Sequence, residues 1–116
     1  MRTVQVTLAG RTLDLAVTFK AAEAIARDVH DPMHIAREAA LEAMIPDYVP
    51  KWQPGVATVP LILHAGVTGL TVDEVKALCA DAGYAEARDA AMRFVMAIVT
   101  PTSQVKVEAA KGNPGE

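Results

Sequence analysis

In TVQVTLAGRTLDLAVT, residues 3–18, apolar and polar side chains alternate on both sides of a glycine. The apolar positions share one face of each run: Val4, Val6 and Leu8 in the first, Leu13, Leu15 and Val17 in the second. A period of two is typical of a half-buried strand, and Ala9-Gly10 supplies a two-residue turn. The stretch predicts a β-hairpin with an apolar face that other elements must cover.

The rest of the chain has helical periodicity. Thr18 is placed to cap a helix from Phe19, which we expect to cover the hairpin with Phe19 and the alanines that follow at helical spacing. Asp31-Pro32 starts a second helix that runs to about Met44. Apolar segments over 59–65, 72–82 and 84–99 complete the pattern. The predicted fold is α+β: one domain over residues 1–100, with an N-terminal hairpin and four or five packed helices.

Two segments do not fit a helix or a strand. Residues 45–60 hold four prolines and the single tryptophan, Trp52, so a continuous helix is excluded there. Residues 101–116 are polar and end in Gly-Asn-Pro-Gly-Glu, which predicts a disordered, flexible C-terminal tail. Thr71 and Glu74, by contrast, form a capping box, the clearest local signal in the sequence.

Composition limits the class of function. The formal net charge is −3 and the pI is near 5.6, so no overall positive field favours nucleic acid. Aromatic residues make up only 4% of the chain, which disfavours a deep small-molecule pocket. One cysteine, no signal peptide and no apolar run of about 18 residues indicate a cytoplasmic protein outside the membrane.

Catalytic and metal-binding interpretations are weak. Cys79 and His64 would have to act as nucleophile and base, but Cys79 lies on the apolar stripe of its predicted helix, where a thiol behaves as a small hydrophobe. His30 and His34 are four residues apart, yet Asp31-Pro32 begins a new helix between them, so we expect two separate surface histidines. We therefore predict no catalytic residue, no metal ligand and no cofactor.

An interaction surface is the stronger hypothesis. The predicted helix over residues 32–44 carries an apolar band too wide to be covered by one neighbour. Its candidate partner-binding residues are Met33, Ile35, Leu41 and Met44. Trp52 is a fifth candidate, either as a partner anchor or as a residue that pins the proline-rich segment to the core.

A helix-turn-helix outline spans residues 74–95, with two helices joined at Ala82-Gly83. The second helix presents Glu86 and Asp89 as freely as Arg88 and Arg93, without the amide side chains that read bases. A packed helical hairpin is therefore favoured over a DNA reader.

The order VTLAGRTLDLAVTFKAAEAIARD, then VPLILHAGVTGLTVDEVKALCADAGYAEARDAAMRFVMAIV, resembles the small tail assembly chaperones of long-tailed phages, in particular those of gene transfer agents and related alphaproteobacterial prophages. The likeness lies in layout and in soft motifs over most of residues 3–99. The proline-rich segment 45–60 departs from the family pattern.

The resemblance implies a non-enzymatic protein of the bacterial host cytoplasm that binds the tape-measure protein and helps tail-tube protein subunits assemble around it. It also implies absence from the mature particle. Homo-oligomerisation and a longer frameshifted form stay open. The alternatives are a minor structural phage protein, such as a head-tail connector or a tail component, and a helix-turn-helix DNA-binding regulator.

Overall fold

The computed structural model describes residues 2–100 and confirms the α+β fold. The chain runs through β1 (Thr3–Leu8), β2 (Arg11–Ala16), α1 (Phe19–Asp28), α2 (Pro32–Met44), α3 (Val59–Gly66), α4 (Val72–Ala82) and α5 (Tyr84–Val99). The predicted disordered tail, residues 101–116, lies outside the described residues.

The predicted hairpin forms, and its register places Leu8 opposite Arg11 and Val6 opposite Leu13. Ala9 and Gly10 both have positive φ, 52° and 78°, which makes the connection a two-residue turn of the kind that matches strand twist. The inward face of the hairpin is buried: Val6, Leu8, Leu13 and Leu15. The alternating pattern thus sets both the register and the side that faces the core.

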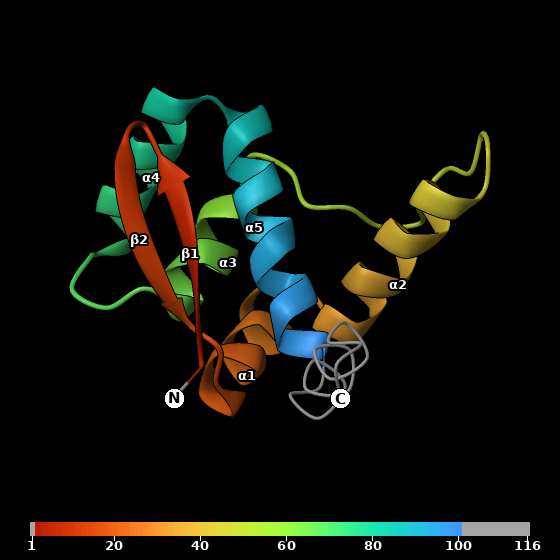
Figure 1. The fold of residues 1–116 in the computed structure, drawn as a ribbon, viewed down its shortest axis with the longest axis horizontal. Coiled ribbons are helices and arrows are strands. Elements are labelled where there is room, and N and C mark those ends of the chain that lie inside the picture. The colour runs from red at the N-terminus through yellow and green to blue at the C-terminus, as the bar shows by residue number, and fades with distance from the viewer. Residues whose placement is uncertain (1, 101–116) are drawn as a thin grey trace, which may run out of the picture.

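Helices α3, α4 and α5, rather than α1, make the main contacts with the hairpin (Figure 1). The expectation that α1 covers the hairpin is wrong, because α1 turns the face of Ala21 and Ile25 into the core and packs on α3. Phe19 is the first helical residue and projects outward, with 79% of its surface exposed. The apolar stripe of α1 is therefore rotated by one position from the predicted one.

The centre of the core lies where α3 meets α5. Gly66 ends α3 against Phe94, which is fully buried, and a Cβ added at Gly66 would overlap the Phe94 ring. Gly66 is the last residue of α3 and permits close packing against α5, and Gly69, which has positive φ, makes the turn that follows. The predicted capping box of Thr71 and Glu74 is present at the start of α4.

Candidate partner-binding site

The C-terminal half of α2 leads away from the body of the molecule, and the following segment returns toward α3 (Figure 1). We call residues 40–49, the far end of this excursion, the arm. The arm exposes large apolar side chains: Met44 at 76%, Val49 at 80%, and Ile45. Monomeric proteins seldom leave neighbouring apolar side chains this exposed without an interaction to serve.

The structure separates the five predicted partner-binding residues. Met33 and Met44 are exposed and lie near opposite ends of α2, while Leu41 is half-buried. Ile35 is buried in the core and Trp52 is packed against it. Ile35 therefore has no surface for a partner to contact. The exposed apolar group of the arm consists of the predicted residue Met44 with Ile45 and Val49, two residues that were not predicted.

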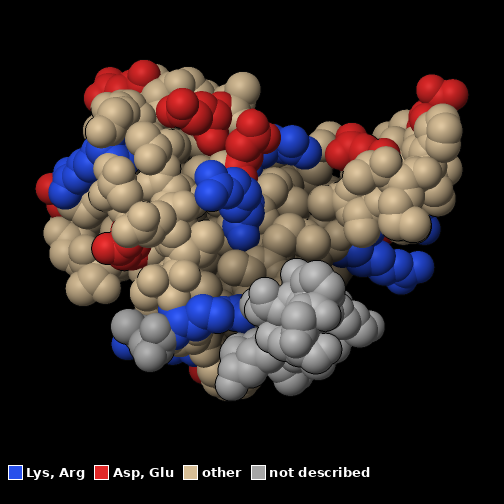
Figure 2. Space-filling model, viewed as in Figure 1, with Lys and Arg blue, Asp and Glu red and all other residues tan. Residues whose placement is uncertain are grey.

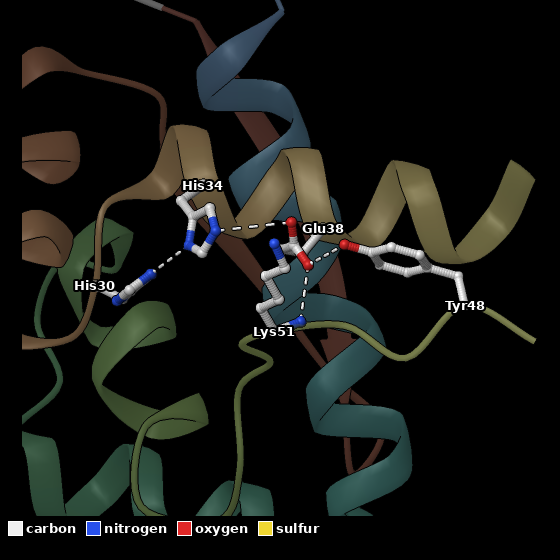
Figure 3. Close-up of polar contacts among 5 residues, drawn as sticks. All are labelled: His30, His34, Glu38, Tyr48 and Lys51. Carbon is white, nitrogen blue, oxygen red and sulfur yellow. Dashed lines mark hydrogen bonds and ion pairs between the residues drawn. The ribbon is translucent and has the colours of Figure 1, made fainter. Parts of the chain in front are cut away.

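The base of the arm is held by Glu38, which is only 2% exposed. Its Oε1 accepts hydrogen bonds from the Tyr48 hydroxyl and the Lys51 backbone amide, both at 2.7 Å (Figure 3). Its other oxygen, Oε2, lies 3.7 Å from Nε2 of His34. One buried carboxylate on α2 thus fastens both the tip turn and the returning chain to the helix.

These contacts determine the ionisation of the site. The Lys51 amide, followed by the Tyr48 hydroxyl, stabilises the carboxylate and lowers the pKa of Glu38 below its usual value. The same bond to Glu38 raises the pKa of Tyr48. Glu38 is therefore ionised and Tyr48 is a donor at neutral pH, so the bond between them is charge-assisted.

His30 and His34 meet, contrary to the prediction that the helix break would separate them. His30 Nε2 lies 2.7 Å from His34 Nδ1, and the ring centroids are 4.9 Å apart. The His30 amide donates to the Ile25 carbonyl at the end of α1, and Asp31 caps α2 through the Met33 amide. The chain therefore bends at Asp31 in a way that brings the two rings together.

Trp52 lies on the other side of His30. The two rings are stacked, with centroids 4.5 Å apart and planes 5° from parallel. Gln53, the next residue, accepts a hydrogen bond from Arg88 of α5, and Pro54 is buried. These contacts support the interpretation of Trp52 as a residue that pins the proline-rich segment to the body of the protein.

The remaining surface gives less support to other functions. Figure 2 shows Lys and Arg interspersed with Asp and Glu on the face that carries β1 and α5, without a continuous basic strip. On α5, Arg88 bonds Gln53, and Arg93 donates to the Gln5 carbonyl at 3.4 Å. Both arginines of the helix-turn-helix outline are therefore engaged within the chain.

The two residues considered for catalysis, Cys79 and His64, lack the surroundings of a nucleophile and its base. Cys79 is fully buried, and burial raises the pKa of its thiol, which disfavours the reactive thiolate. His64 is half-buried on α3 and forms no side-chain hydrogen bond within residues 2–100. Among the described residues, no three His, Cys, Asp or Glu side chains converge as a metal site requires.

Glu38 is not among the candidate residues predicted from the sequence. The available signal was indirect: Tyr48 and Lys51 lie 10 and 13 residues further along the chain, and nothing in the proline-rich spacing fixes where that chain returns. Only the three-dimensional course of residues 45–52 makes Glu38 a buried residue.

Comparison of the chain with protein-family models, curated proteins and solved structures finds no match. Within residues 2–100, no helix combines the length and apolar character needed to cross a bilayer.

Proposed function

We propose that this protein is a tail assembly chaperone of the phage or gene-transfer-agent type, which binds the tape-measure protein in the bacterial host cytoplasm without catalysis. The sequence resemblance supports this function. The structural observation that carries it is the arm, where Met44, Ile45 and Val49 are exposed on a helix end that Glu38 holds in place.

The arm is suited to a helical partner. A tape-measure protein of long helical stretches would present apolar stripes, which can pack against apolar side chains on a projecting helix end. Met44 adds adaptability, because an unbranched thioether side chain packs against many shapes. The apolar surface is flanked by the exposed carboxylates of Glu42 and Asp47, which favours partner stripes bordered by Lys or Arg.

The chaperone role also accounts for the fixed base of the arm. A binding surface loses less conformational entropy on association when it is already ordered. Bound to the arm, the tape-measure protein would be kept soluble until tail-tube protein subunits assemble around it, after which the chaperone leaves. This proposal places the protein outside the mature particle, and recovery from purified particles would favour the minor structural protein instead.

The test is co-expression with a candidate tape-measure protein, using the double variant Met44→Asp with Val49→Asp. Both side chains are highly exposed, so we expect the variant to fold and its thermal unfolding to match wild type. We expect the soluble fraction of the tape-measure protein, and its recovery with the tagged chaperone, to fall by at least tenfold.

The matched control is Phe19→Asp, which makes the same apolar-to-acidic change at an equally exposed position on α1. It should retain wild-type recovery of the tape-measure protein. If the arm variant folds and keeps the partner soluble as well as Phe19→Asp does, the arm is not the binding surface.

A further inference from the structure

We infer that His30, His34 and Glu38 form a proton-operated latch at the base of the arm, closed while the histidine pair holds at most one extra proton and opened when both rings are protonated. The inference rests on the proposed function only for what the arm binds. The latch is defined by contacts within the chain and is tested without a partner.

The neutral pair has one arrangement that suits both neighbours. His30 Nε2 donates its proton to His34 Nδ1 across 2.7 Å, and His34 then carries its own proton on Nε2, which faces Glu38 Oε2 at 3.7 Å. The opposite tautomer of His34 would aim a lone pair at the buried carboxylate. The three groups thus form a directional chain from the α1–α2 junction to Glu38 (Figure 3).

A first extra proton leaves this chain intact. On His30 it occupies Nδ1, away from His34, and the imidazolium then lies face to face with Trp52, which favours a cation. On His34 it occupies Nδ1, and His30 then carries its own single proton on Nδ1, so that His30 Nε2 accepts the hydrogen bond while His34 Nε2–H keeps its attraction to Glu38. Either singly protonated form preserves the contact between the two rings.

A second proton removes the contact. With both rings protonated, His30 Nε2 and His34 Nδ1 each carry hydrogen, so two donors and two positive charges face each other across 2.7 Å. The rings must separate. Because His30 stacks on Trp52, and Trp52 pins the returning segment, separation loosens the end of the segment that Glu38 holds.

The charged and titratable groups around the pair come from four elements. They are Arg27 and Asp28 at the end of α1, Asp31, Arg37 and Glu38 on α2 or its cap, Tyr48 and Lys51 on the returning segment, and Arg88 on α5 beside Trp52. Arg27 and Asp28 pair with each other, and Glu38 is the one of these groups that contacts an imidazole within residues 2–100.

The chain provides its own reporter, because Trp52 is the only tryptophan and touches His30. We would record Trp52 emission from pH 8 to pH 5, the range in which histidine takes up protons, in buffer containing EDTA. In wild type, Trp52 emission should change in two steps as the pH falls. His30→Phe should lose the change, since a phenyl ring stacks on the indole but binds no proton. His34→Gln should reduce it to one step.

The matched control is His64→Gln, which removes the third histidine and leaves the latch untouched; it should give the wild-type profile. Far-UV circular dichroism at each pH checks that the helices persist. The latch is contradicted if Trp52 emission of wild type does not change with pH, or if the change in emission is still present in His30→Phe. It is also contradicted if the change in emission coincides with loss of helix. Each of these results leaves the partner-binding test of the arm unaffected.

Discussion

Gly66 shows how one residue determines the packing of two helices. It ends α3 where the Phe94 ring of α5 approaches the backbone, at a distance that leaves no room for a side chain. Gly66 is therefore a packing requirement rather than a flexible joint. Protein interiors are close-packed, so a single added carbon here forces either the ring or the helix to move.

We predict that Gly66→Ala lowers the free energy of unfolding by about 1–3 kcal/mol, the usual range for overpacking, and lowers Tm by roughly 4–8 °C per kcal/mol. Thermal unfolding followed by circular dichroism measures this. Gly55→Ala is the control, because a Cβ at Gly55 meets no atom within 4 Å and its backbone φ is not in the left-handed region. Equal Tm values for the two variants would contradict the packing role.

Glu38 is the residue whose charge holds the arm. Its pKa is lowered in the folded state by the Lys51 amide and the Tyr48 hydroxyl, so the stabilisation is present above the ordinary pKa of glutamate, about 4.3, and is lost as the pH falls through the lowered value. We predict that Glu38→Gln lowers Tm at pH 7. The difference in Tm between this variant and wild type should become smaller below about pH 4.

Glu42→Gln on the same helix is the control for that experiment, since the side chain of Glu42 is exposed and forms no hydrogen bond within residues 2–100. Its Tm should follow wild type at every pH. A constant difference between Glu38→Gln and wild type from pH 7 to pH 3 would show that the ionised carboxylate does not contribute.

At the scale of elements, local signals in the sequence were sufficient wherever an element is determined by its own residues. The capping box of Thr71 and Glu74, the proline start of α2 and the hairpin all follow from local chemistry, and all are confirmed. The rotation of α1 and the meeting of His30 with His34 were not predictable in this way. Both depend on where a helix lies after a bend, which long-range packing decides.

The turn of the hairpin predicts a stabilising change. Ala9 has φ 52°, a conformation that costs an L-residue roughly 1–2 kcal/mol, and asparagine tolerates it better. Ala9→Asn should therefore raise the unfolding free energy by about 0.5–1 kcal/mol. Gly10→Ala, at φ 78°, should lower the free energy of unfolding. Urea unfolding measures both, and a destabilised Ala9→Asn would contradict the turn geometry.

The whole molecule divides into a packed body and an arm, and the arm exposes three large apolar side chains within six residues, Met44, Ile45 and Val49. The sequence predicted an interaction surface on the second helix but included Ile35, which the core buries, and omitted Ile45 and Val49. A helical wheel cannot distinguish a face covered by its own chain from one left open. That distinction depends on the path of residues 45–58, which proline spacing does not specify.

Hydrogen exchange of the purified complex measures whether the tape-measure protein binds the arm. We predict that amides of residues 40–49 exchange more slowly in the complex than in the free chaperone, while those of the hairpin and α4 are unchanged. Protection confined to β1 and α5, or no protection anywhere despite stable binding, would contradict it.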